Sequence, residues 1–320
     1  MRECILFRMR AWVGVTDGDW YRYLSERNAT EVNFWQPSGG REFRAIERGA
    51  PFLFKSHYHD GNKIVGGGFF SGWAALPMSR AWEFFGHENG CTSINEMRAR
   101  ITKYNRTADP DPEIGCIMLY DVLFFRSTAQ PEAPPDWSRN IVQGKGYDLA
   151  TASGSYVEHV FAALLAEHSQ MPPDGAGHRF VDGPVFGKPT LRPVRVGQNA
   201  FKALVQEAYG RRCAVTGTKI VPVLEAAHIR PVTNAGENRV DNGLLLRSDV
   251  HKLFDDGYLG IHPSTKVLMV SPRLRLEYGN GEEFYAKAQA RQAVTIPQRL
   301  VDQPNSEFLE WHADEVFLAS

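Results

Sequence analysis

The chain has 320 residues, of which 43% are apolar and 23% charged, and its formal net charge is −1. This is the composition of a folded globular protein, and the length exceeds that of one ordinary core, so we expect two domains. No apolar run approaches the roughly 20 residues of a membrane span, and the N-terminus lacks the regions of a signal peptide. The four cysteines are dispersed, which suits a reducing compartment, so we expect a cytoplasmic protein without a membrane partner.

The N-terminal part is rich in strand-forming and aromatic residues. Apolar runs typical of strands lie at residues 10–15, 51–55, 63–70 and 115–125. Helical spacing of apolar residues occurs at 81–85 and 94–104. Several strands with short helices between them indicate a small curved sheet or barrel.

This part resembles the EVE domains of the PUA-like superfamily, whose members read flipped or modified bases. The resemblance rests on the run Asn33-Phe34-Trp35-Gln36-Pro37-Ser38, on the strands at Gly49–Lys55 and Ile64–Phe69, and on Gly115-Cys116-Ile117. It implies a PUA-like β-barrel that binds a modified cytosine, namely 5-methylcytosine or 5-hydroxymethylcytosine extruded from duplex DNA.

Four residues are candidates for the modified-base pocket: Trp35, Ser38, Phe70 and Trp73. An extruded base is best held between aromatic side chains that exclude water. Trp35 precedes a segment rich in Pro, Ser and Gly, which predicts a loop position, and Trp73 follows a triple glycine that allows close backbone approach. For both tryptophans a place in the hydrophobic core is an equally open alternative, because aromatic residues dominate core burial.

Prolines and glycines interrupt the regular pattern after the first apolar strands. Residues 127–138 hold three prolines, residues 171–177 read as a loop, and helical spacing lies between them at 156–167. We therefore predict a modified-base-binding domain over residues 1–130, a linker with a helix over 131–187, and a second domain over 188–320. A further amphipathic helix over 201–208 opens that second domain.

The second domain contains the most informative pattern, which is His228, Asn242 and His251 in that order. Strands are predicted at 213–217 and 222–228, and a helix is predicted to start near Ser248. His251 and Asp255 are four residues apart on this helix and share one face. Hydrolysis of a phosphodiester needs a base that activates water, a group that orients the base, and a hard cation beside the leaving oxygen.

The strings Glu225-Ala226-Ala227-His228-Ile229-Arg230-Pro231, Asn242-Gly243-Leu244 and His251-Lys252-Leu253-Phe254-Asp255 resemble the HNH nucleases and their ββα-metal fold. The resemblance implies that His228 is the general base, that Asn242 fixes the loop that orients it, and that His251 is a metal ligand. Asp255 stands where some relatives have a further ligand. Ala227 departs from the family, which often has Asp or His there, so Glu225, waters or phosphate oxygens would complete the shell.

The two resemblances together predict an α+β chain with a PUA-like β-barrel reader domain followed by a ββα-metal HNH nuclease domain, as in modification-dependent restriction endonucleases. We expect a hydrolase that binds double-stranded DNA with a modified cytosine and cuts nearby with a divalent metal ion, Mg²⁺ or alternatively Mn²⁺, Co²⁺ or Ni²⁺. Residues 188–275 hold fourteen Lys or Arg against seven Asp or Glu, which favours phosphate attraction. One HNH site cuts one strand, so a double-strand break requires a homodimer or two separately bound chains.

Two other functions are compatible with the same residues. A non-cleaving reader of modified nucleic acid is favoured by Ala227 and opposed by the complete set of His228, Asn242 and His251. An HNH nuclease without modification preference would use its N-terminal domain as a general DNA clamp.

Overall fold

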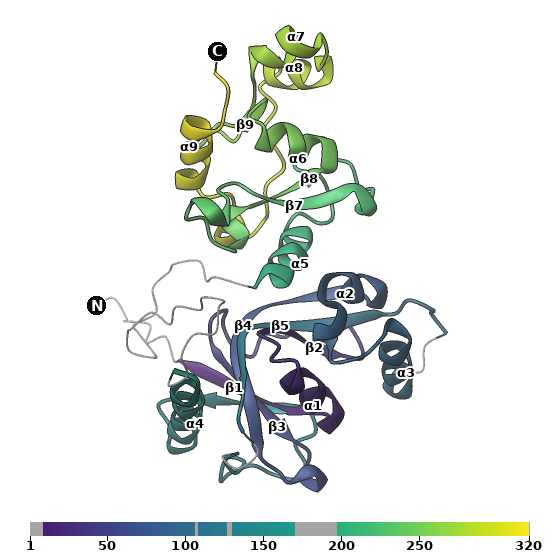
Figure 1. The fold of residues 1–320 in the computed structure, drawn as a ribbon, viewed down its shortest axis with the longest axis vertical. Helices are drawn as coiled ribbons and strands as arrows, with labels where there is room; N and C mark the ends of the chain where they lie inside the picture. Colours follow the sequence, from purple (N-terminus) through teal and green to yellow (C-terminus); the bar gives the residue numbers. More distant parts are fainter. Residues whose placement is uncertain (1–8, 106–107, 127–129, 170–196, 320) are drawn as a thin grey trace, which may run out of the picture. The chain divides into compact units, whose positions relative to one another are not determined.

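The computed structural model describes residues 9–105, 108–126, 130–169 and 197–319. These residues form two compact units that divide between Gly197 and Gln198 (Figure 1). Both units mix helices and strands, which confirms the α+β prediction. None of the helices in these ranges is long and apolar enough to cross a membrane.

A six-stranded mixed sheet is the frame of the N-terminal unit. Its strand order is β2-β5-β4-β3-β1-β6, and β1 pairs with β3 in parallel while every other neighbouring pair is antiparallel. The strands are β1 (Arg10–Thr16), β2 (Glu31–Gln36), β3 (Pro51–Ser56), β4 (Ile64–Pro77), β5 (Glu113–Phe124) and β6 (Gly144–Asp148).

The predicted β-barrel is not found among the described residues, because β2 and β6 end the sheet and do not pair with each other. Curvature comes instead from the long strand β4, whose pairing with β5 shifts register between Gly67 and Phe69 and again between Phe70 and Gly72. Such irregularities bend a strand and increase its twist. The sheet is therefore curved and open.

Helices cover both faces of this sheet. Successive strand residues point to opposite sides, and both sides carry apolar side chains that the helices bury. The helices are α1 (Gly18–Glu26), α2 (Met78–Phe85), α3 (Ile94–Tyr104) and α4 (Ala152–Ser169). One face packs with α4 in a core that includes Val13, Leu53, Ile64, Phe161 and Leu164. The other packs with α1 in an aromatic core that includes Trp20, Leu24, Phe52, Phe54 and Phe70.

Strand β6 and helix α4 belong to this unit, although the sequence placed both in a linker over residues 131–187. Strand β6 pairs with β1, and α4 buries one side against the sheet. The proline-rich segment before them is also bound to the sheet, since the Ile64 N–H donates to the Pro131 carbonyl at 2.8 Å and the Ala133 N–H to the Asn62 carbonyl at 3.1 Å. The prolines suggested a linker because proline lacks an N–H and has a fixed φ, which interrupt regular structure locally. These local properties do not show whether the segment also packs on a distant sheet.

The C-terminal unit is built on an antiparallel hairpin and one helix. Strand β7 (Leu224–His228) pairs with β8 (Gly243–Arg247), which places His228 opposite Gly243. Helix α6 (Ser248–Asp255) follows at once and buries Val250 and Phe254. The remaining elements are α5 (Gln198–Ala208), β9 (Leu259–Ile261), β10 (Leu268–Val270), α7 (Pro272–Tyr278), α8 (Glu282–Gln289) and α9 (Ser306–Glu315).

The strand predicted at 213–217 is wrong, because this segment is a turn. The Cys213 N–H donates to the Thr218 carbonyl, and the Cys213 Sγ accepts the N–H groups of Thr216 and Arg247. Gly217 has a φ of 73°, in the left-handed region that favours glycine. The second strand of the hairpin is β8, directly after Asn242.

Phe161 tests whether α4 is an integral part of the N-terminal unit. This side chain is 1% exposed and makes an edge-to-face contact with Phe69 at 5.1 Å. Phe161→Ala should lower the free energy of unfolding by about 3–5 kcal/mol, measured by urea denaturation. Ala163→Ser, at an exposed position of the same helix, is the control, and a Phe161→Ala variant as stable as this control would return α4 to a linker.

Candidate active site

His228 lies at the end of β7 with its ring held on two sides. The ring stacks on Phe201 of α5 with centroids 4.1 Å apart and an interplanar angle of 9°. Its Nε2 lies 2.9 Å from the Asn238 side-chain oxygen Oδ1. One contact fixes the plane of the imidazole, and the other fixes its rotation within that plane.

The contact with Asn238 also determines which nitrogen of His228 carries the proton. An amide oxygen can only accept a hydrogen bond, so Nε2 is the donor and Nδ1 keeps its lone pair. Burial lowers the pKa of His228, and the nearby His251 acts in the same direction, while Asn238 and Asp255 oppose the shift. A neutral imidazole with a free Nδ1 has the form that a general base needs.

Asn242 is fully buried and clasps the loop that follows His228. Its side-chain oxygen accepts the Arg230 N–H at 2.9 Å, and its amide nitrogen donates to the carbonyls of Arg230 and Glu237, both at 2.9 Å. Its own carbonyl accepts the Ile229 N–H at 2.9 Å. The structure thus places Asn242 on the loop backbone, while the direct contact to the His228 ring comes from Asn238.

His251 lies on α6 between two carboxylates. Its Nδ1 is 2.6 Å from a Glu225 oxygen, and its Nε2 is 3.3 Å from an Asp255 oxygen. Burial raises the pKa of the Asp255 carboxyl, His251 opposes that shift, and the negative charges of Asp256 and Glu225 reinforce it. Glu225 therefore contacts His251 at Nδ1 and Asp255 contacts it at Nε2, so the two carboxylates have different roles at the ring.

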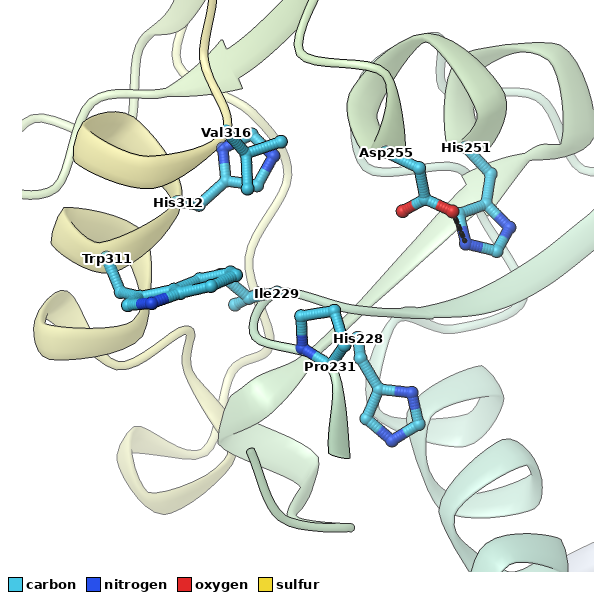
Figure 2. Close-up of a pocket in the computed structure, with 8 residues that line it drawn as sticks. All are labelled: His228, Ile229, Pro231, His251, Asp255, Trp311, His312 and Val316. Carbon is cyan, nitrogen blue, oxygen red and sulfur yellow. Dashed lines mark ion pairs between the residues drawn. The ribbon is translucent and has the colours of Figure 1, made fainter. Parts of the chain in front are cut away.

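These side chains converge on one cavity of about 330 Å³, shown in Figure 2. His228 and the residues after it form its floor, α6 contributes His251 and Asp255, and α9 forms the opposite wall. The complete lining is His228, Ile229, Pro231, His251, Asp255, Trp311, His312 and Val316. The structure therefore brings together three of the four nuclease residues named from the sequence, with Asn242 buried behind them.

Two side chains at this cavity, His251 and Asp255, could both coordinate one divalent cation. Two donors that bind one cation at about 2.1 Å and at right angles lie about 3 Å apart, which is close to the 3.3 Å between His251 Nε2 and Asp255 Oδ2. Glu225 on the far nitrogen matches the carboxylate that commonly orients a metal-bound histidine. Among the described residues no group of three or more His, Cys, Asp or Glu side chains is arranged to hold a metal ion.

The four base-pocket candidates of the N-terminal unit are not all brought together, because Trp35 is separated from Trp73. Trp35 and Ala74 both pair with Cys116, whereas Trp73 pairs with Ile117, the next residue along β5. Paired residues share a face and successive residues alternate, so Trp35 and Trp73 lie on opposite faces of the sheet. The Trp35 indole N–H donates to the Asn89 carbonyl at 3.0 Å, and Trp35 lies within β2 rather than in the predicted loop.

Phe70 and Trp73 share the face that carries the aromatic core. Phe70 is 4% exposed and belongs to that core, and Trp73 packs against it with its indole N–H buried and without a hydrogen-bond partner among the described residues. Ser38 is exposed. A Cβ at Gly115 would lie 3.0 Å from Trp73 Nε1, 3.1 Å from Gln36 Oε1 and 3.1 Å from the Ser38 carbonyl oxygen, so these three groups surround the bare backbone of Gly115.

The hairpin, the loop and the helix match a family model described as HNH endonuclease over residues 213–262. These residues form an HNH endonuclease domain. HNH endonucleases are hydrolases that typically use a divalent metal ion. No curated protein matches the sequence.

Solved structures resemble the chain at low identity. ASCH from Zymomonas mobilis and a mutant of it each align with a TM-score of 0.34 and 8% identity over 47% of this chain, and over 94% and 97% of their own lengths, respectively. A protein described as the modification-dependent TagI restriction endonuclease aligns with a TM-score of 0.26 and 14% identity over 90% of this chain and 76% of its own.

Three residues that contact His228 or line the cavity were missed by the sequence analysis. Asn238 and Phe201 hold the His228 ring and Trp311 lines the cavity, and all three lie outside the strings that resemble the family. Phe201 falls in the helix predicted over 201–208 but was given no role at the site. Asn238 is four residues before Asn242, and a second asparagine in the same loop is the one signal that could have indicated it. Nothing in the local sequence indicates that Trp311 reaches the cavity.

His312 joins α9 to α6, and its pKa differs between the folded and unfolded protein. Its ring stacks on Phe254 at 3.7 Å, its Nε2 lies 3.0 Å from the Phe254 carbonyl oxygen, and it is 2% exposed. Burial lowers the pKa of His312 to about 4. A buried neutral histidine must gain a proton on unfolding below its unfolded pKa of about 6.5, so folding is disfavoured as the pH falls.

We predict that the free energy of unfolding decreases as pH is lowered from about 6.5 towards about 4, with this one group contributing at most about 1.4 kcal/mol per pH unit. His312→Phe keeps a ring against Phe254 but removes the titrating group, so its stability should change less steeply with pH. Denaturant unfolding of both proteins across this range measures the difference. His228 also has a lowered pKa but is present in both proteins, so parallel pH profiles would contradict the assignment to His312.

Proposed function

We propose that this chain is a modification-dependent DNA endonuclease, in which the HNH domain hydrolyses a phosphodiester bond near a modified cytosine recognised by the N-terminal unit. The observation that carries the nuclease proposal is the convergence of His228, His251 and Asp255 on one cavity. Asn238 contacts the His228 ring, and Glu225 contacts His251. In Figure 2, His228 lies apart from the pair His251 and Asp255.

His228 is proposed as the general base. Its Nδ1 takes a proton from the attacking water, while Asn238 holds Nε2–H and Phe201 holds the ring plane. The Asp255 charge favours the protonated imidazole that results. Asn242 is proposed to keep the loop in the shape that places Asn238 beside His228.

His251 and Asp255 are proposed as the protein ligands of the cation, with Glu225 orienting the His251 ring from its other nitrogen. A divalent ion at these residues, Mg²⁺ or alternatively Mn²⁺, Co²⁺ or Ni²⁺, would stabilise negative charge on the phosphate and the leaving oxygen. Waters and phosphate oxygens would complete the coordination shell at the position where Ala227 offers no ligand. Removing the ion would leave Asp255 in an environment that already disfavours its charge.

His228→Ala should abolish base catalysis but leave the cavity walls in place. We expect the nicking rate to fall by about 10²- to 10⁴-fold, with DNA affinity nearly unchanged, because a proton acceptor contributes to rate rather than to binding. Nicking of supercoiled plasmid and an electrophoretic mobility assay measure the two quantities. Asn238→Ala should give a smaller loss of rate, and wild-type cleavage by His228→Ala would remove His228 from the mechanism.

For the N-terminal unit we propose a pocket for 5-methylcytosine or 5-hydroxymethylcytosine centred on Trp73 rather than on Trp35. Extruding a base costs a few kcal/mol, which stacking and hydrogen bonds in the pocket must recover. Trp73 carries an aromatic ring and a buried indole N–H without a hydrogen-bond partner among the described residues, and Gln36 and Ser38 lie beside it around Gly115. Trp35 already uses its N–H on Asn89.

Matched duplexes that carry cytosine, 5-methylcytosine, 5-hydroxymethylcytosine or a glucosylated base test this proposal with each divalent ion in turn. We expect cleavage of the methylated and hydroxymethylated duplexes, because an added methyl group gives about 1 to 3 kcal/mol of discrimination. Trp73→Phe keeps the ring but loses the N–H, so it should reduce that preference. Trp35→Phe is the matched control and should preserve it.

Each other outcome of this assay identifies a different function. Equal cleavage of all duplexes would contradict the reader proposal and support an HNH nuclease whose N-terminal unit is a general DNA clamp. Preferential binding of modified duplexes without cleavage under any ion would support a non-cleaving reader. Binding assays with modified RNA would then test whether this reader also binds RNA. Because one HNH site cuts one strand, breaking both strands requires a homodimer or a second, independently bound chain.

A further inference from the structure

One wall of the catalytic cavity comes from outside the segment that matches the HNH family. Helix α9 supplies Trp311 and His312 to this wall and Val316 directly follows the helix, whereas the match ends at residue 262. Trp311 is the only tryptophan in residues 198–320 of the sequence. Figure 2 shows its ring projecting from α9 towards Ile229 and Pro231, in the cavity that His228 and His251 also line.

Arg230 connects this tryptophan to the catalytic loop. The Arg230 backbone is held on both sides by Asn242, and its Nε donates to the Asn234 carbonyl at 2.6 Å. Its guanidinium carbon lies over the Trp311 ring, 5.4 Å from the centroid. A fixed cation, Arg230, and the aromatic face of Trp311 therefore lie together on the loop and helix next to His228, the proposed general base. A cation and an aromatic face together can bind a nucleotide, the cation through its phosphate and the ring through its nucleobase.

Helix α9 is anchored firmly enough to position Trp311. At its start the Asn305 N–H donates to the Asp241 carbonyl at 2.9 Å, and Asp241 itself pairs with Arg239 at 2.7 Å. One residue beyond Trp311, His312 stacks on Phe254 of α6. The ring of Trp311 thus lies between two contacts that join α9 to the elements carrying Asn242 and His251.

We infer that Trp311 stacks on the base of the nucleotide adjoining the scissile phosphate, with Arg230 contacting that nucleotide's backbone. A cavity of about 330 Å³ is at the lower end of the range of about 300–1,000 Å³ for small-molecule sites. It suits one nucleotide that is unstacked from its neighbours. The inference rests on the proposed nuclease function and assigns to Trp311 the positioning of the substrate.

Trp311→Ala should raise the KM for nicking of modified duplex by about 5- to 150-fold and change kcat much less. This is the range expected for losing one stacked base, since stacking contributes equally before and during the reaction. Trp311→Phe, which keeps an aromatic face, should restore KM to within a few-fold of wild type. Tyr278→Ala, which removes a 63% exposed tyrosine on α7, is the matched control, and an unchanged KM in Trp311→Ala would overturn the inference.

A second measurement does not depend on cleavage. Short oligodeoxythymidylate, added to the full chain in the presence of a chelator, should quench tryptophan fluorescence by stacking on Trp311. The quench should disappear in Trp311→Phe and persist in Trp82→Phe, and loss of the quench in Arg230→Gln would support the shared site. A quench that survives in Trp311→Phe would refute the inference.

The two measurements separate this inference from the nuclease proposal. Trp311-dependent quenching by a chain that cuts no DNA under any ion would support the nucleotide site and contradict the nuclease function. Cleavage of modified DNA with unchanged kinetics in Trp311→Ala would do the reverse.

Discussion

The buried side chain of Asn242 is the interaction on which the geometry of the C-terminal unit depends. It pairs with three backbone groups of the loop between β7 and β8. An amide offers both a donor and an acceptor, which aspartate and leucine of similar size do not. Leaving such groups unpaired in a buried place costs about 1–3 kcal/mol each. The loop shape set in this way puts Asn238 beside His228 and Arg230 beside Trp311, and both His228 and Trp311 line the cavity.

The cavity extends beyond the segment that matches the HNH family. Helix α9 contacts the loop through Asn305 and Asp241, and the helix α6 through His312 and Phe254. Without α9 and Val316, the residue that follows it, the cavity would lose three of its eight lining residues. The hairpin and helix carry the proposed chemistry, and in our proposal the added helix α9 would give the substrate a surface to bind.

Strand alternation decides in a comparable way which tryptophans of the N-terminal unit can share one pocket. A residue of β5 and the residue after it face opposite sides, so the tryptophans paired with Cys116 and Ile117 are separated by the sheet itself. Trp35 therefore joins the Asn89 side, and Trp73 joins the aromatic core side with its N–H unused. Only the second combines an aromatic ring with a hydrogen-bond donor that has no partner in the described part of the chain.

The sequence alone determined the elements whose patterns are local. Strands β1, β3 and β5 and helices α3 and α6 were predicted from periodicity, and the order of His228, Asn242 and His251 indicated the strand, loop and helix that carry them, whereas the pairing of β7 with β8 was not predicted. Tertiary structure decided the rest: that the sheet is open, that α4 packs on it, that Glu225 contacts His251 at 2.6 Å, and that Trp311 reaches the cavity. Periodicity and capping report on neighbours a few positions apart, whereas these contacts join residues far apart in the chain and depend on which elements pair.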